Sequence, residues 1–348
     1  MHMADALLSP GVAGTMYVAS TAVAALSVYK LRKSEDEQLS FSSKKLPTMA
    51  VMSALVFAGQ MINYTIPGTG SSGHICGGLL LTSLLGPYAA FLSMIAVLVI
   101  QCLFFADGGL MALGANIWNM AFYGCFVGYF LVMKPLMKTK LNTKLKLILG
   151  SVLGCVLTLQ MGAFSVVLET SLSGITELPF KQFVLLMQPI HLAIGLVEGL
   201  ATSAILIFVE STSPDLVKVV SSKKNGSFKT TVAVLLICVI AIGGGFSLLA
   251  SSNPDGLEWA LFGNTEYSES RENMGLDEEE YGVSSKVSDK AGIIQEKTSF
   301  LPDYAFAGDD ENPLGTSVSG IVGSAIVAVV AVGLGVAGGA LRKKKKAA

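Results

Sequence analysis

The sequence predicts an all-α integral membrane protein, and two observations support this prediction. The 348 residues are 52% hydrophobic and only 14% charged, with a mean hydropathy of +0.61. Soluble domains carry about 25% charged residues, so this composition is typical of a membrane protein. Long apolar segments also recur along the whole chain, separated by basic or turn-rich connections. We expect about seven helices in a first bundle and two more in an accessory unit.

Nine apolar segments provide these helices. A membrane-spanning helix needs about 20 apolar residues, and the third segment is too short for an ordinary span. The segments cover residues 10–29, 46–64, 75–85, 88–105, 110–133, 147–168, 183–208, 230–249 and 318–341. Because the composition changes after the seventh segment, we divide the chain into residues 1–212, a cytoplasmic linker at 213–229 and residues 230–348. The last part contains a polar insert at residues 251–317.

Basic residues between the segments predict how the chain crosses the membrane. They gather after the first, fifth, seventh and ninth segments, and the positive-inside rule places such stretches in the cytoplasm. Nine crossings put all four on one side, with the N-terminus outside and the C-terminus in the cytoplasm of a multi-pass cell-membrane protein. The insert 251–317 holds fifteen acidic and four basic residues and falls outside. The basic C-terminal tail indicates orientation and a membrane-lipid contact, not a nucleic-acid site.

Several kinds of chemistry have no signal in this sequence. No GxxxxGK(S/T) phosphate loop is present, so we expect separate proteins to hydrolyse ATP. The chain also lacks an HExxH zinc motif and a Ser/His/Asp set with a plausible shared face, and is therefore not predicted to be an enzyme. The five cysteines lie in apolar stretches without a CxxC pair, which is typical of small core residues. We expect no catalytic residue and no resident cofactor.

The first two residues can bind a metal ion. The Met1 α-amine, the backbone nitrogen of His2 and the His2 imidazole Nδ1 can close two fused chelate rings in one plane, and planar nitrogen coordination suits Ni²⁺ and Cu²⁺. Asp5 and the lack of a basic N-terminal region argue against a cleaved signal peptide, so we expect Met1 to keep its amine. Terminal residues are commonly poorly ordered, however, so the pair alone leaves a metal site and a loose end as alternatives.

His74 is the candidate for a fourth ligand. It follows a turn-rich loop at residues 66–73 and precedes a short apolar segment. A loop histidine at the membrane surface is the simpler interpretation. Irregular backbone at membrane depth persists, however, only where it is buried in protein or lines a cavity. The charge pattern also places His2 and His74, two of only three histidines, on the same outer side, and this favours a metal site.

Four other polar residues lie inside predicted spans. His191 and Glu198 are seven residues apart on one helix face, where ionisable groups are costly and commonly functional. They either support the metal ligands through hydrogen bonds or form a helix-packing pair. Asn116 and Asn119, one helical turn apart, either support the ligands in the same way or join neighbouring helices.

Four separated motifs give the chain a family resemblance. They are MHMADALLSP at residues 1–10, IPGTGSSGH at 66–74, GGLMALGAN at 108–116 and HLAIGLVEG at 191–199. Together they resemble the CbiM/NikM family, the substrate-binding (S) membrane subunits of energy-coupling-factor (ECF) transporters for cobalt and nickel. PDGLEW at 254–259 and PDYAF at 302–306 look like the two-helix CbiN/NikN accessory subunit, or PDGLE domain, fused in the same chain.

The resemblance implies a function, a set of ligands and a set of partners. The Met1 amine, the His2 amide nitrogen, the His2 imidazole and the His74 imidazole would hold Ni²⁺ or Co²⁺. This ECF-type ABC importer would also need a transmembrane coupling (T) subunit and two cytoplasmic ATPase subunits. The alternatives are an S-component for a small organic vitamin, with Trp118 and Tyr123 in its site, and a membrane scaffold that transports nothing. The first alternative leaves the two external histidines unexplained.

Overall fold

The computed structural model describes residues 1–33, 46–175, 179–220, 226–263, 281–306, 308–309 and 312–347, with side chains up to residue 336. Within these ranges the protein is mostly helical, and its sheet is a single two-stranded hairpin. Interpretations that involve Lys44, Lys45, Glu177, Lys223 and Lys224 lie outside the described residues. The same holds for the acidic residues between positions 264 and 280 and at positions 310 and 311.

The helices follow the predicted apolar segments. In the first 220 residues the elements are the 3-10 helix η1 (Asp5–Leu7), α1 (Pro10–Lys33), α2 (Leu46–Gln60), β1 (Tyr64–Ile66), β2 (Ser71–Gly73), α3 (Gly78–Leu85), α4 (Pro87–Phe105), α5 (Leu113–Asn116), the π-helix η2 (Ile117–Met133), α6 (Lys134–Met137), α7 (Thr143–Leu172) and α8 (Phe180–Thr212). The later elements are α9 (Phe228–Gly244), the 3-10 helix η3 (Phe246–Leu249), α10 (Gly256–Phe262), α11 (Lys286–Thr298), the 3-10 helix η4 (Pro302–Tyr304) and α12 (Pro313–Ala347).

Six helices of the described residues are long and apolar enough to cross a membrane. They are α1, α4, the continuous helix Leu113–Met137, α7, α8 and the Pro313–Val336 part of α12. Helices α2 and α9 are apolar but have only 15 and 17 residues, and α3 has eight. Each of the nine predicted segments therefore corresponds to a helix, and the all-α membrane class is confirmed. Three of the nine helices are nevertheless shorter than a full span.

A β-hairpin replaces part of the second predicted segment and most of the loop that follows it. Helix α2 ends at Gln60, and β1 then pairs antiparallel with β2, with Tyr64 opposite Gly73. The turn between the strands has positive φ at Gly68 and Gly70 (76° and 74°), which glycine adopts without steric cost. The hairpin thus gives hydrogen-bond partners to backbone groups that are costly to leave unpaired at membrane depth.

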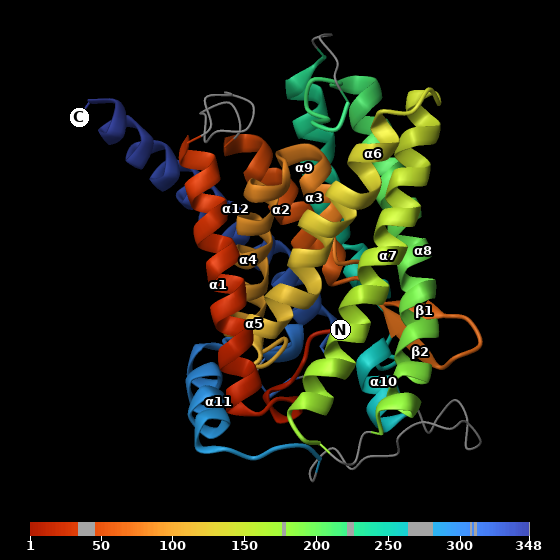
Figure 1. Ribbon diagram of the computed structural model, residues 1–348, viewed down its shortest axis with the longest axis vertical. Coiled ribbons are helices and arrows are strands. Elements are labelled where there is room, and N and C mark those ends of the chain that lie inside the picture. The colour runs from red at the N-terminus through yellow and green to blue at the C-terminus, as the bar shows by residue number, and fades with distance from the viewer. Residues whose placement is uncertain are drawn as a thin grey trace.

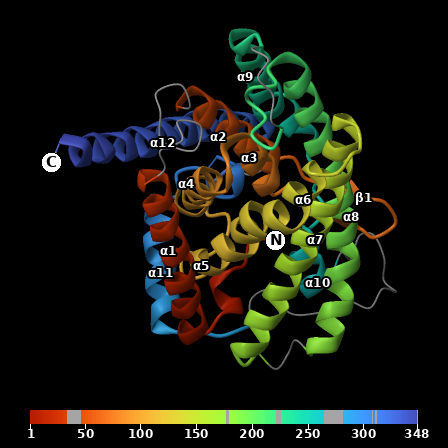
Figure 2. The same ribbon diagram turned by 45° about the horizontal axis from the view of Figure 1, so that its top comes forward.

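The C-terminal helices pack on the first bundle instead of forming a separate one. Helix α12 packs against α2 and also contacts α4, while α9 contacts both α2 and α12. Figure 2 shows α12, in blue, beside α2. Small residues permit the closest contact, because a Cβ added to Gly243 would lie 3.0 Å from the backbone of Gly320. Gly243 is therefore a packing residue between α9 and α12.

The two ends of the bundle carry different elements. The C-terminal end of α1, helix α6 and the start of α9 lie toward the top of Figure 1, and each carries lysine or arginine. The hairpin, α10 and α11 lie toward the opposite end. The basic residues at the end of α1, on α6 and at the start of α9 therefore lie at the end away from the hairpin that leads to His74, while α11 at the hairpin end carries three lysines.

Candidate metal centre

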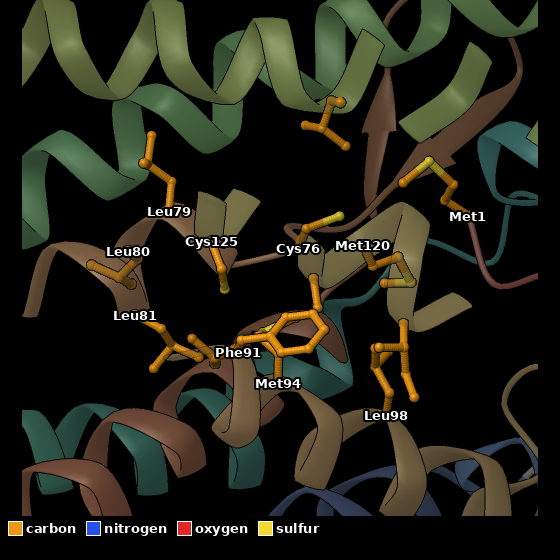
Figure 3. Close-up of a cluster of buried hydrophobic side chains, with 14 of the residues drawn as sticks. Met1, Cys76, Leu79, Leu80, Leu81, Phe91, Met94, Leu98, Met120 and Cys125 are labelled. Carbon is orange, nitrogen blue, oxygen red and sulfur yellow. The ribbon is translucent and has the colours of Figure 1, made fainter. Parts of the chain in front are cut away.

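The N-terminus is buried in the core. Met1, Met3 and Leu7 are each at most 4% exposed. Figure 3 shows Met1 at the edge of a hydrophobic cluster that also holds Cys76 and Met120. Burial of these apolar side chains holds the segment in place, so the alternative of a loose N-terminal end does not describe this structure.

Hydrogen bonds add to this anchor. Asn116, the last residue of α5, accepts a hydrogen bond from the Met3 N–H at 2.8 Å and donates one to the Met3 carbonyl at 3.1 Å. The Gly109 N–H donates to the same carbonyl at 2.9 Å. Asp5 Oδ1 accepts from the Ala112 N–H at 2.9 Å, and a Cβ added to Gly109 would collide with the Asp5 carboxylate. The chain between α4 and α5 therefore holds the N-terminal segment in place, and it requires glycine at position 109, where it comes closest to Asp5.

Three candidate ligand residues come together at the N-terminus. The Met1 amine nitrogen lies 3.5 Å from Nε2 of His74, a residue 73 positions away in the chain. The rings of His2 and His74 stack with their centroids 5.3 Å apart and 20° between their planes. The His74 Nδ1 donates to the Ile75 carbonyl at 3.1 Å, which leaves the lone pair of Nε2 available toward the amine.

Two carboxylates contact the N-terminal nitrogens. Asp255 Oδ2 accepts a hydrogen bond from the Met1 amine at 2.5 Å, and Asp107 Oδ1 lies 3.0 Å from Nδ1 of His2. Burial disfavours the charged amine, but attraction to Asp255, together with smaller effects of Cys76 and Asp107, raises the pKa of the Met1 amine. Burial likewise opposes ionisation of Asp107, yet His2 lowers the pKa of Asp107 to about 2. Burial lowers the pKa of His74 to about 3, so its imidazole is neutral, as a metal ligand has to be.

The His2 ring is not free for the predicted chelate. The chelate needs Nδ1 for the metal, whereas Nδ1 here binds Asp107, so the metal and this carboxylate compete for one nitrogen. The Nε2 of His2 is buried without a hydrogen-bond partner among the described residues. Among those residues, no three side chains of His, Cys, Asp or Glu come close enough together to hold a metal ion. A metal site here therefore depends on the backbone nitrogens of Met1 and His2.

Glu198 holds the segment that follows His74. Its two carboxylate oxygens accept hydrogen bonds from the backbone N–H groups of Cys76 and Gly77, at 2.7 and 2.9 Å. Gly77 has a φ of 78°, so α3 begins directly after a left-handed residue. A buried carboxylate on α8 thus fixes the backbone between the hairpin and α3.

Replacing Glu198 by alanine is expected to destabilise the protein by about 2–6 kcal/mol, because two buried N–H groups lose their acceptor at about 1–3 kcal/mol each. Glu198→Gln retains one acceptor and should cost about half as much. The midpoint of thermal unfolding in detergent measures the loss. Glu210→Ala, further along α8, is the matched control. Equal midpoints for the Glu198→Ala and Glu210→Ala proteins would contradict this role.

His191 lies beside the same centre but contacts none of its nitrogens. Its Nδ1 donates to the Met187 carbonyl at 2.8 Å, and its Nε2 has no hydrogen-bond partner in the described part of the chain. The residue lines a cavity of about 10 Å³ together with Met1, His74 and Asp255. A cavity of that volume holds about one water molecule, which would give Nε2 a partner.

Asn119 contacts Met3 and a buried glutamate, not the N-terminal nitrogens themselves. It donates a hydrogen bond to Oε2 of Glu169 at 2.8 Å, and its Nδ2 is 3.6 Å from the sulfur of Met3. Asn119 and Glu169 are 1% and 5% exposed, so this bond is buried between η2 and α7. Asn119 therefore joins two helices and contacts the N-terminal segment at Met3.

A larger cavity, of about 370 Å³, opens beside the N-terminus. Its lining includes five carboxylates, from Asp5, Asp107, Asp255, Glu258 and Asp303. The charge of Asp255 raises the pKa of Glu258 to about 7. Sequence reasoning assigned no site role to Asp107 and placed Asp255 only within the PDGLEW motif. The signal that could have identified both is a carboxylate immediately before glycine on the predicted outer side of the membrane.

The aromatic residues considered for a vitamin site bind each other. Trp118 stacks on Phe122 with ring centroids 4.0 Å apart, and its Nε1–H donates to the Tyr123 hydroxyl at 3.2 Å. Neither Trp118 nor Tyr123 lines the cavity of about 370 Å³ beside the N-terminus. This cavity therefore gives the vitamin alternative no support.

Comparisons with known proteins agree with the four motifs. The family model CbiM, described as "Cobalt uptake substrate-specific transmembrane region", matches residues 2–216. The chain belongs to the CbiM family. A second model, the PDGLE domain, matches residues 229–338, which we call the PDGLE domain below. The resemblance to a CbiM-type protein fused to a PDGLE domain is thus confirmed.

Relatives of this CbiM-family chain are named as transport proteins. "Putative fused nickel transport protein NikMN" of Archaeoglobus fulgidus is 34% identical over 94% of this chain and 95% of its own. A cobalt transport protein CbiM of Sorangium cellulosum is 29% identical over 62% of this chain and 94% of its own. The crystal structure of a truncated transition metal transporter matches 61% of this chain and 99% of its own, with 32% identity and a TM-score of 0.52. The chain is therefore a multi-pass membrane protein of a nickel and cobalt transport family.

Proposed function

We propose that this protein captures Ni²⁺ or Co²⁺ for uptake, with the Met1 amine, the His2 amide nitrogen, His2 Nδ1 and His74 Nε2 as ligands. The observation that carries the proposal is the buried Met1 amine 3.5 Å from the available nitrogen of His74. Four further residues support the ligands without binding the metal: Asn116, Asn119, His191 and Glu198. Of these, Asn116 holds Met3 and Glu198 holds the backbone just after His74.

The proposed ligands favour a planar metal complex. Two fused rings at Met1 and His2 place three nitrogens in one plane, and His74 fills the fourth corner. A deprotonated amide is a strong-field ligand, so Ni²⁺ gains most from this geometry, while Cu²⁺ is the competitor with the higher affinity. The amine and the amide each lose a proton when the metal binds, so acid should weaken binding. Nδ1 of His2 must exchange Asp107 for the metal.

The direction of transport and the partners are also part of the proposal. We place the N-terminus outside and the C-terminus in the cytoplasm, because the basic ends of α1, α6 and α9 gather at one end of the bundle (Figure 1). The ion then enters past the acidic residues that line the cavity beside His2. A T subunit and two ATPase subunits of an ECF importer would use ATP to deliver it inward. Residues 1–212 form the S-component, 213–229 the linker and 230–348 the accessory unit.

The absorption spectrum of the purified protein with Ni²⁺ tests the proposed site. We expect the yellow band of low-spin, square-planar Ni²⁺, because four nitrogens that include an amide anion impose that geometry. Protein whose N-terminal amine has been acetylated is the control, and it should not develop the band. A green, octahedral spectrum from the unmodified protein would rule out the four-nitrogen site.

A further inference from the structure

The PDGLE domain reaches the N-terminal amine through one carboxylate. Asp255 precedes α10, and its Oδ1 accepts hydrogen bonds from the Leu257 and Glu258 N–H groups at 2.7 and 3.0 Å. The Glu258 side chain accepts from the Asp255 N–H at 3.0 Å, which completes a capping box. These bonds fix the carboxylate through one oxygen. Its other oxygen, Oδ2, is left to accept the hydrogen bond from the Met1 amine.

The backbone around Asp255 is also tied to the strand that leads to His74. The Ser72 N–H donates to the Pro254 carbonyl at 2.8 Å, and the Ser72 hydroxyl donates to the Asn253 carbonyl at 2.8 Å. Ser72 lies on β2, two residues before His74. One short segment of the PDGLE domain therefore holds both the amine and the strand that carries the fourth proposed ligand.

A second contact from the PDGLE domain is made with Asp107, the carboxylate beside His2. The Tyr304 hydroxyl donates to Asp107 Oδ2 at 2.5 Å, while Asp107 Oδ1 lies 3.0 Å from His2 Nδ1. Asp303 and Tyr304 both have positive φ (48° and 61°), an uncommon conformation for residues other than glycine. Backbone strain of this kind persists only where the surrounding structure holds it, as the Asp107 contact does here.

We propose that Asp255 is a positioning residue of the metal centre, so that the PDGLE domain is part of the site. This inference rests on the proposed function. An amine bound to a metal keeps two N–H bonds, and one of them can donate to Oδ2 of Asp255. That bond directs the nitrogen lone pair and increases the donor strength of the amine, as outer hydrogen-bond partners of metal ligands do. Asp255 binds the amine and not the metal.

The main rival explanation is that Asp255 acts only through its charge. Glu258 lines the same cavity and also carries a carboxyl group, but its side chain binds the Asp255 N–H and not the Met1 amine. Glu258→Gln is therefore the matched control, because glutamine still completes a capping box while the carboxylate is lost. Serine and asparagine are both good N-cap residues, so Asp255→Ser and Asp255→Asn preserve the start of α10. Only the serine side chain is too short to reach the amine.

The experiment measures the Kd for Ni²⁺ and the Ni²⁺ absorption band in the full-length protein and these three variants. We expect Asp255→Ser to raise the Kd about 10- to 100-fold and to shift the band, because loss of an outer partner weakens and reorients a ligand. Asp255→Asn should also raise the Kd, because its single oxygen caps α10 and its NH2 group cannot accept from the amine. This variant carries the test if the serine variant does not fold. Glu258→Gln should change the Kd far less than Asp255→Ser and should leave the band in place, because glutamine still accepts from the Asp255 N–H and the Met1 amine keeps its partner.

Two results would overturn the role of Asp255. The first is an unchanged Kd and band in both Asp255 variants, when His74→Ala raises the Kd and shifts the band in the same assay. The second is an equal loss of affinity in Glu258→Gln, which would assign the effect to charge in the cavity. Failure of the proposed function looks different, because the unaltered protein would then give no planar Ni²⁺ band at all.

Discussion

We expect a two-residue extension before Met1 to abolish the proposed high-affinity binding of Ni²⁺. The extension converts the Met1 amine into a peptide nitrogen and moves the new amine about 7 Å along the chain. Met1 is only 4% exposed, and its nitrogen contacts Asp255 and His74. The added residues must therefore also displace the N-terminal segment from its buried position. Loss of an outer partner alone costs about 10- to 100-fold in affinity, and loss of a ligand should exceed that. Competition with a chelator of known affinity measures the Kd.

The controls for this extension use the same chain. The same two residues added after Ala348 should leave the Kd unchanged. A one-residue extension is a separate diagnostic, because an amine, two amides and a third-position imidazole close three fused rings without His74. That protein should bind Ni²⁺ in a planar site that no longer depends on His74. Unchanged, His74-dependent binding by the two-residue extension would show that the amine is not a ligand.

Replacing His74 by alanine is expected to raise the Kd for Ni²⁺ more than about 100-fold, which exceeds the effect of losing an outer partner. The three nitrogens at Met1 and His2 remain, but water then occupies the fourth corner of the plane. The absorption band of Ni²⁺ should move to longer wavelength, because water is a weaker-field ligand than imidazole. Titration followed by absorption spectroscopy measures both changes in one experiment.

His191→Ala is the matched control for His74. Both histidines are buried and line the cavity of about 10 Å³, but only His74 lies at hydrogen-bonding distance from the Met1 amine. The His191 variant should therefore keep the band position, with at most a moderate change in Kd. If the two variants lose affinity equally and keep the band of the unaltered protein, His74 is not a ligand.

Much of the fold could be predicted because hydropathy is a local property of the chain. Each of the nine apolar segments corresponds to a helix, and the class of the protein follows from composition. The end of α2 was predicted too late, since Met61 and Ile62 continue the apolar run although α2 ends at Gln60 and Tyr64 pairs with β2. Hydropathy does not distinguish these two outcomes, because strand pairing depends on a partner elsewhere in the chain.

The candidate ligands were within reach of sequence reasoning, but their partners were not. Chelate chemistry selected Met1 and His2, and the charge pattern placed His74 on the same side. The contact between Met1 and Asp255 spans 254 residues, and that between Glu198 and Gly77 spans 121. No spacing rule connects residues so far apart, and a carboxylate beside glycine is also common in ordinary turns.

The sequence by itself determined that this is a helical membrane protein and supplied Met1 and His2 as candidate ligands, because composition, segment length and ligand chemistry are properties of short stretches. The tertiary structure alone decided that the Met1 amine is buried, that it contacts His74 and Asp255, and that Asp107 occupies Nδ1 of His2. The physical reason is that packing brings together groups that are distant in the chain, and their burial and charge only then act on each other. His74 and Asp107 meet the N-terminus within the first bundle, whereas Asp255 arrives with α10, which packs against α8 and β2.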